Sequence, residues 1–532
     1  MNNLKLLDCT MRDGGYLNDW EFGHDTMTSI FERLVSSGID IIEVGFLDER
    51  RNFDINRSIM PNTQSVQEIY GNIDKGNAMI VGMIDYGTCS IKHIQPCNES
   101  YLDGIRVIFK KHVMHEAINF CKQIKELGYK VFTQAVSITS YNDEELLELI
   151  ELVNDLQPYA VSMVDTYGLL HQDNLIHIFD IMDANLNSQI CIGYHAHNNF
   201  QMGYANCIEI LNKKVDRTIL VDATLYGMGK SAGNTPIELI SMYMNENLGK
   251  KYDISQMLEA IEINIMDIYN NIPWGYNLFY YISAANKCHP NYVSYLMNKR
   301  TLSIKSINEL LKCIDNEKKL LYSKEHIEEL YLKYQQNECA DADAISDLSA
   351  ELRDKLVLLI GPGKNIKLNL EKIREYITEE QPIVIAINYI PNVNQLKYLF
   401  ITNSKRYAQM ATKLSEAGYR DLKTIATSNV TKTNGSFSYV LNYSSLIDAQ
   451  TEIPDNSLIM LLKTLENAGV KKVALAGFDG YSESEMNYFN TNMEYSFAKE
   501  KTNYLNNYAK TFLSDYKKRV DVEFVTSSYY EI

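Results

Sequence analysis

Short apolar runs alternate with longer amphipathic stretches from residue 3 to about residue 247. The apolar runs have the length and the β-branched content of buried strands, whereas stretches such as 25–38 and 143–156 carry apolar residues at helical spacing. Strands that alternate with helices predict right-handed βαβ units and a parallel sheet. Eight such units in about 250 residues is the size of a closed (β/α)₈ TIM barrel, and an open doubly wound sheet is the alternative.

The rest of the chain has a different pattern. Residues 250–335 read as amphipathic helices around an aromatic-rich segment, 273–300, which we expect to form core or a dimer contact rather than a lid. Small and acidic residues then predict a linker over 336–352. A new α/β pattern follows, so we predict a TIM-barrel domain (1–249), a helical appendage (250–335), the linker, and a C-terminal three-layer, Rossmann-like α/β domain (353–532).

Composition narrows the function classes. The chain has 532 residues, 45% of them hydrophobic and 22% charged, with a formal net charge of −17. A surface this acidic repels phosphate backbones and anionic lipid, which argues against nucleic-acid or membrane binding. Nine cysteines without a CxxC pair, no leader-like start and no membrane-length apolar run together favour a cytoplasmic protein with reduced thiols.

Polar residues gather where the predicted barrel strands end. Barrel enzymes place their active sites at the carboxyl ends of the strands, so these residues are candidates for a site. We expect Glu43, Gln134 and Thr166 to contact a substrate. The full set is Arg12, Asp13, Glu43, Asp85, Arg106, Lys110, Gln134, Ser137, Asp165, Thr166, His195 and His197.

His195 and His197 form the most specific pattern in the chain. Residues i and i+2 of a strand point to the same face, so the two imidazoles lie side by side. Barrel closure can bring Asp13, at the end of the first strand, next to them. Two histidines and one carboxylate leave coordination positions open, which is typical of a catalytic metal. Without thiolate ligands we expect Mn²⁺ or Mg²⁺, with Co²⁺, Fe²⁺ or Zn²⁺ as alternatives.

Three motifs in order suggest a family. "LDCTMRDGG" (7–15), "HAHNN" (195–199) and "GMGKSAGNTPIE" (227–238) together resemble the DRE-TIM metallolyases, which are similar to HMG-CoA lyase, and most of all the 4-hydroxy-2-oxoacid aldolases. The resemblance implies that Asp13, His195 and His197 bind a divalent metal and that Arg12 steadies the enolate oxygen of pyruvate. In the lyases the asparagine of the glycine loop, here Asn234, also approaches the metal.

One position departs from the family pattern. The family aldolases carry a histidine base three residues after the metal aspartate, where this chain has Tyr16. An ordinary tyrosine, with a pKa near about 10, is a poor base at neutral pH. The base is therefore Tyr16 with a lowered pKa, a water on the metal, or Lys110, and Tyr16 can equally be a wall of the substrate pocket.

The C-terminal domain offers a weaker signal. "LLIGPGKNI" reads as a strand followed by Gly361, Pro362 and Gly363, without the third glycine of a dinucleotide fingerprint. The turn faintly resembles those of nucleotide-sugar-binding domains. It is either a ligand turn, with Asp479 in the same cleft, or a purely structural tight turn.

Together these features predict a two-domain enzyme. We expect a metal-dependent lyase that cleaves or forms a 4-hydroxy-2-oxoacid from pyruvate and an aldehyde, sugar-derived if the C-terminal domain binds sugars. Acyl-CoA-dependent Claisen condensation, as in isopropylmalate synthase, is the second hypothesis, and a non-catalytic scaffold barrel is the third. The expected partners are the two small substrates and a second copy of the chain in a homodimer.

Overall fold

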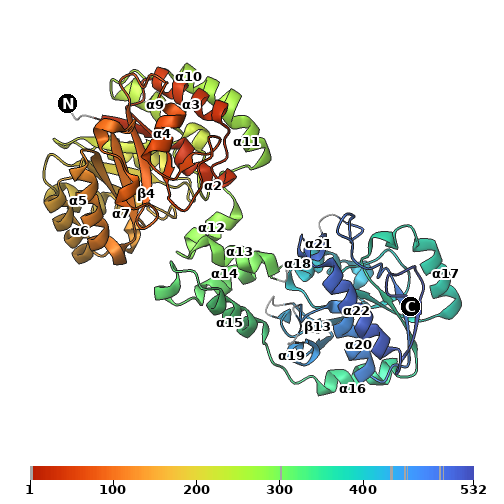
Figure 1. The fold of residues 1–532 in the computed structure, drawn as a ribbon. Helices are drawn as coiled ribbons and strands as arrows, with labels where there is room; N and C mark the ends of the chain where they lie inside the picture. Colours follow the sequence, from red (N-terminus) through yellow and green to blue (C-terminus); the bar gives the residue numbers. More distant parts are fainter. Residues whose placement is uncertain are drawn as a thin grey trace. The chain divides into compact units, whose positions relative to one another are not determined.

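The chain forms two compact units. The computed structural model describes residues 4–299, 302–431, 435–448, 451, 453–490, 493–494 and 496–531. Contacts divide the chain into Met1–Pro290 and Asn291–Ile532, which we describe one at a time (Figure 1). Among the described residues, no helix has the length and apolar character needed to cross a bilayer.

The first unit is built on a closed barrel of eight parallel strands. Its hydrogen-bonded order is β1-β9-β8-β7-β6-β5-β4-β2, and β1 also pairs with β2, which closes the ring. The predicted TIM barrel is therefore confirmed. The strands are β1 (Leu4–Asp8), β2 (Ile41–Leu47), β4 (Met79–Asp85), β5 (Gly104–Phe109), β6 (Lys130–Ala135), β7 (Ala160–Asp165), β8 (Cys191–Ala196) and β9 (Ile219–Ala223).

Helices follow most strands, as the alternating pattern predicts. Helix α6 shows why they begin where they do: Asn142 and Glu145 form a reciprocal capping box at its start. The helices are α3 (His24–Ser36), α4 (Thr63–Tyr70), α5 (Met114–Glu126), α6 (Asp143–Leu156), α7 (Gln172–Asn185), α8 (Gly203–Leu211) and α9 (Ile237–Asn247). The connection between β4 and β5 contains two short 3₁₀ turns, Ile91–His93 and Cys97–Glu99.

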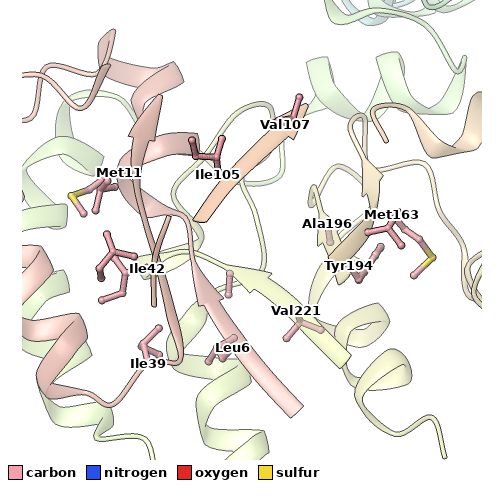
Figure 2. Packing of buried hydrophobic residues seen from close by; sticks show 14 of the residues in the cluster. Leu6, Met11, Ile39, Ile42, Ile105, Val107, Met163, Tyr194, Ala196 and Val221 are labelled. Carbon is pink, nitrogen blue, oxygen red and sulfur yellow. The ribbon is translucent and has the colours of Figure 1, made fainter. Parts of the chain in front are cut away.

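Alternation along the strands sorts side chains to the two faces of the barrel wall. One set packs outward against the helices, including Leu6, Ile42 and Val221 (Figure 2). The other set points inward and forms an apolar cluster of its own, which includes Leu7 and Phe132. Further along the same strands the inward positions become charged, so the interior changes from apolar to ionic toward the carboxyl ends.

Short helices continue the first unit beyond the barrel. Helix α10 (Ile254–Ala260) packs on α3 and α9, and a π-helical turn (Ile261–Ile265) joins it to α11 (Met266–Asn271). Helix α12 (Leu278–Ala285) follows. The unit ends at Pro290, whereas the sequence predicts a single appendage to residue 335. The predicted appendage is thus shared between the two units.

The second unit is a parallel sheet in the order β14-β13-β12-β11-β10-β15-β16. This confirms the predicted second α/β domain. Three helices, α13 (Pro290–Lys299), α14 (Ile304–Lys312) and α15 (Lys324–Gln335), precede it. The strands are β10 (Leu356–Ile360), β11 (Ile383–Ile387), β12 (Leu396–Ile401), β13 (Lys423–Thr427), β14 (Tyr439–Leu441), β15 (Lys472–Ala476) and β16 (Asp521–Phe524).

Helices cover both faces of this sheet. Residues of α17 (Leu370–Glu380) and α18 (Ser404–Leu414) pack on one face, and residues of α16 (Ala342–Leu352), α20 (Ser457–Asn467) and α22 (Thr502–Tyr516) on the other. Helix α16 lies within the range predicted as a linker, 336–352. The structure differs there because Leu348 and Leu352, one helical turn apart, are buried in the core of the domain.

Candidate active site

Three side chains of the predicted metal site come together at the carboxyl end of the barrel. Asp13 ends the short helix α1 (Thr10–Asp13), which follows β1, and His195 and His197 lie at the end of β8. One ligand atom from each lies within 4.8 Å of the others, and all three residues are buried. The structure therefore places together the residues that the HxH spacing and the RDG turn suggested.

The turn after β1 is held by Asp8. Its carboxylate accepts hydrogen bonds from the backbone N–H of Thr10 at 3.0 Å and from the Thr10 hydroxyl at 2.6 Å. The following glycines give space: a Cβ on Gly14 would lie 2.4 Å from the Thr10 carbonyl oxygen, and one on Gly15 would overlap the Trp20 ring. Close packing, not an unusual backbone angle, thus explains why glycine follows the aspartate.

Both histidines are oriented by an acceptor at Nδ1. The Nδ1 of His195 lies 2.9 Å from Oδ2 of Asp222, and the Nδ1 of His197 lies 3.1 Å from the carbonyl oxygen of Lys230. An acceptor at Nδ1 fixes the proton there and leaves Nε2 as a ligand atom. Burial lowers the pKa of His197 to about 3, so its imidazole is neutral as metal binding requires.

Asn234 completes the donor set. Its Nδ2 donates to Oδ2 of Asp13 at 2.5 Å, while its buried Oδ1 has no hydrogen-bond partner among the described residues. A buried amide oxygen without a donor is costly unless something else satisfies it. Two imidazoles, a carboxylate and this oxygen fit a divalent cation. A Cβ on Gly229 would lie 2.5 Å from Oδ2 of Asp13, so the glycine loop must pass close to the site.

Arg12 lies beside the three candidate metal ligands, and one nitrogen of its guanidinium group is left for a ligand. Its Nη1 donates to Oδ1 of Asp13 at 2.6 Å and its Nε to Oε2 of Glu43 at 2.7 Å. Burial lowers the pKa of Arg12, but the two carboxylates raise it more, so the guanidinium stays charged. For Nη2 the described residues offer no acceptor, which leaves this group for an anionic oxygen of a ligand.

A layer of charged residues lies inside the barrel. Arg106 is fully buried and pairs with Glu43, at 3.0 Å from Nη1 to Oε2, and with Asp222. Asp222 in turn orients His195, and Glu43 holds Arg12. Sequence reasoning missed Asp222, although it stands near the end of the eighth barrel strand like the other candidates. Cys9, His195 and Asp222 form a second cluster of ligand-type atoms, but Asp222 is already bound to Arg106.

The predicted substrate contacts lie at different depths. Glu43 and Gln134 belong to the charged layer, where Gln134 accepts from Arg106 at 3.0 Å and donates to Ser162 at 3.1 Å. Thr166 follows the end of β7, and its hydroxyl accepts from the backbone N–H of Ser137 at 2.8 Å. Contact of these side chains with a substrate stays a prediction.

Tyr16 lies at the mouth of the barrel on helix α2 (Gly15–Asn18). It is 40% exposed, and its ring contacts Trp20 and lies 5.0 Å from Nζ of Lys230. Desolvation raises the pKa of Tyr16 above its ordinary value; the Arg12 guanidinium opposes this rise, and the carboxylates of Asp13 and Asp85 add to it. The lowered tyrosine pKa considered from the sequence is therefore not what the surroundings produce.

Two further basic residues lie near Lys110, which is exposed at the end of β5. Lys230, in the glycine loop, donates its backbone N–H to Asp13 at 3.2 Å. His289, just after α12, packs edge-on against Tyr167 at 5.8 Å between ring centroids, and Lys230 and Lys110 both act electrostatically on it. Sequence reasoning missed His289 because it lies about 90 residues beyond the HxH motif, in a segment taken as helical core.

The glycine turn of the second unit is engaged within the protein. The N–H groups of Gly361 and Gly363 donate to the carbonyl oxygens of Ala476 and Gly477 at 2.8 and 2.9 Å. A Cβ on Gly363 would lie 2.5 Å from Oδ2 of Asp479, which accepts from the backbone N–H of Asn365 at 2.8 Å. Close approach of two loops accounts for these glycines, and a role in ligand binding stays a prediction.

Comparison with known proteins agrees with the motifs. The HMGL-like family model matches residues 3–264. The chain is 23% identical to a 4-hydroxy-2-oxovalerate aldolase from Pseudoalteromonas translucida over 49% of this chain and 76% of that protein. It is 24% identical to an oxaloacetate decarboxylase from Mycobacterium tuberculosis over 51% of this chain and 80% of that protein.

A third relative is named as a synthase. The chain is 23% identical to a 2-isopropylmalate synthase from Sulfolobus acidocaldarius over 47% of this chain, and the match spans 64% of that protein. All three matches cover about half of this chain. The barrel described above, with its metal-type triad at the carboxyl ends of the strands, is the region of the family match, and residues 3–264 form a domain of the HMGL-like family.

Proposed function

We propose that the barrel unit is a divalent-metal-dependent aldolase that cleaves or forms a 4-hydroxy-2-oxoacid from pyruvate and an aldehyde. The observation that carries the proposal is the convergence of Asp13, His195 and His197 beside the spare Nη2 of Arg12. The relative named 4-hydroxy-2-oxovalerate aldolase supports it.

The residues of the site have separate roles in this reaction. Asp13, His195, His197 and Asn234 would hold the cation, which acts as a Lewis acid toward the carboxylate and keto oxygens of a 2-oxoacid. Arg12, fixed by Asp13 and Glu43, directs its remaining N–H groups to the oxygen that gains charge when pyruvate becomes an enolate. Because this guanidinium is buried and its orientation is fixed by two carboxylates, it needs no reorganisation during the reaction.

We assign the proton acceptor to His289 and a hydrogen-bond donor role to Tyr16. Burial lowers the pKa of His289 to about 4, and the nearby Lys230 and Lys110 act in the same direction, so its imidazole is neutral at pH 7. A pKa this low makes it a weak base, which would take a proton only from a hydroxyl group that the cation has made acidic. Tyr16, with its raised pKa, keeps its proton. Lys110, one of the three bases considered from the sequence, lies at the same mouth and is the alternative.

The test is exchange of the methyl protons of pyruvate in D₂O, followed by NMR on the Mg²⁺ form. We expect metal-dependent exchange that is lost in Asp13→Asn and kept in Asp173→Asn, a matched change at an exposed position on α7. Absence of exchange with Mg²⁺, Mn²⁺ and Co²⁺ alike would refute the pyruvate proposal. The assay requires no knowledge of the aldehyde.

Acyl-CoA-dependent condensation is the second candidate, favoured by the relative named 2-isopropylmalate synthase. Incubation with acetyl-CoA and a 2-oxoacid separates the two, because a Claisen condensation releases free thiol and an aldol reaction does not. A third relative, the oxaloacetate decarboxylase, would leave the same pyruvate enolate, so release of CO₂ from oxaloacetate should be measured beside both. A purified protein that is inactive in all three assays with added metal would favour a scaffold.

A further inference from the structure

The second unit contains a cavity at the place where its strand order reverses. The chain runs outward from β10 through β11, β12 and β13 to β14, then returns to place β15 on the other side of β10. In open parallel sheets such a reversal leaves a crevice at the carboxyl ends of the strands, where ligands bind. A cavity of about 170 Å³ lies here, lined by the segments that follow β10, β11, β12 and β15.

Part of the lining of this cavity attracts anions. Helices α18 and α20 both begin there, capped by Asn403 and Asn456, whose side chains accept from the first free backbone N–H groups of each helix. The positive ends of two helix dipoles therefore face the cavity. Arg406, only 4% exposed, also lines it and donates from Nη2 to the Met493 carbonyl oxygen at 2.7 Å. Its Nη1 donates to Oε1 of Gln409 at 3.3 Å, so this guanidinium brings a positive charge to the lining of the cavity.

The lining of the cavity also offers acceptors for hydroxyl groups. Asp479 lines the cavity, and its Oδ1 has no partner among the described residues although Oδ2 accepts from Asn365. Asp455 also lines it and accepts from the Tyr443 hydroxyl at 3.3 Å. Burial raises the pKa of both carboxyl groups, which marks them as poorly solvated acceptors. Tyr481, Tyr488 and Tyr530 also line the cavity and supply flat apolar surface of the kind that packs on sugar or base rings.

We propose that this cavity binds a phosphorylated sugar, either a ribonucleotide or a sugar phosphate. The phosphate lies at the starts of α18 and α20 beside Arg406, and the sugar hydroxyls face Asp479. The site is independent of the barrel chemistry and lies wholly within the second unit.

The test is calorimetric titration of the full chain with UDP, ADP, ribose 5-phosphate and glucose 1-phosphate, with uridine and inorganic phosphate as partial probes. We expect at least one phosphorylated sugar to bind more tightly than either partial probe. Tighter binding of UDP or ADP identifies a nucleotide site. Tighter binding of ribose 5-phosphate or glucose 1-phosphate identifies a sugar-phosphate site. No binding at millimolar concentration, or inorganic phosphate binding as well as the rest, overturns the proposal.

The key variant is Asn456→Asp, which keeps a good helix cap but adds a negative charge where the phosphate is placed. We expect about a tenfold or greater loss of affinity for the phosphorylated ligand, with thermal stability unchanged. Asn62→Asp makes the same change at the cap of α4 in the barrel unit and should alter nothing. Equal affinity in wild type and Asn456→Asp would place the phosphate elsewhere and refute the assignment.

Discussion

Arg106 is the residue whose loss should cost the barrel most. It is fully buried, and its guanidinium is the one cation that pairs with both Glu43 and Asp222 among the described residues. Replacing it with methionine conserves much of the volume, so no large cavity forms. What remains is two buried carboxylates that have lost a shared counter-charge.

The expected magnitude follows from that geometry. Removing one partner of a buried ion pair costs about 3–5 kcal/mol, because the remaining charge is left poorly compensated. Arg12 and His195 still contact the two carboxylates, so we expect the lower half of this range. For a unit of this size the loss corresponds to a fall in melting temperature of roughly 5–7 °C. Arg106→Lys keeps the charge and should lose less.

Tryptophan fluorescence gives a selective assay. The chain has two tryptophans, Trp20 and Trp274, and both lie in the barrel unit. Thermal and urea unfolding followed by this signal therefore report on the barrel. The matched control is Arg51→Met, which removes an exposed arginine 3.5 Å from Asp19 and should cost less than about 1 kcal/mol. If Arg106→Met costs no more than this control, the reasoning about the charged layer is wrong.

Three further outcomes are expected. Gly229→Ala should fold but bind Mn²⁺ more weakly in a spin-resonance titration, because its Cβ would lie 2.5 Å from Oδ2 of Asp13. Undiminished binding would show that the loop can move away from Asp13. His289→Asn should slow pyruvate exchange at least about tenfold while Tyr16→Phe slows it less, and the reverse order would make Tyr16 the proton carrier. Burial raises the pKa of Asp8 from 3.8 to about 7, so the folded barrel holds a proton that the unfolded chain has released. The contribution of Asp8 to stability should therefore fall as pH rises from about 4 to 7, so in urea unfolding the wild type should lose stability relative to Asp8→Asn across that range.

The sequence was a good guide to the barrel and to its metal-type triad. Strands buried on both faces give continuous apolar runs, and an HxH pair in a strand has only one geometry, so His195 and His197 could be paired without a structure. Closure of the barrel then brought in Asp13.

Long-range placement was harder to predict. His289 comes from a distant segment that follows α12, and no local periodicity marks a histidine that packs against the end of another strand. Helix α16 was missed because its buried residues, Leu348 and Leu352, are few among small and acidic neighbours. Amphipathic signal scales with the number of apolar residues on the buried face, and two leucines in such a context give little.

The charged layer also sets an order of events at the site. Asp13, Glu43 and Asp222 contribute three carboxylates against the guanidinium groups of Arg12 and Arg106, which leaves one net negative charge in a buried space. An anionic 2-oxoacid is repelled from such a space until a divalent cation has reversed the sign, and its own carboxylate then restores neutrality. Binding should therefore be ordered, with the cation first and the acid second. The empty site carries one negative charge and the cation-bound site one positive charge, so neither state carries more than one unit of charge.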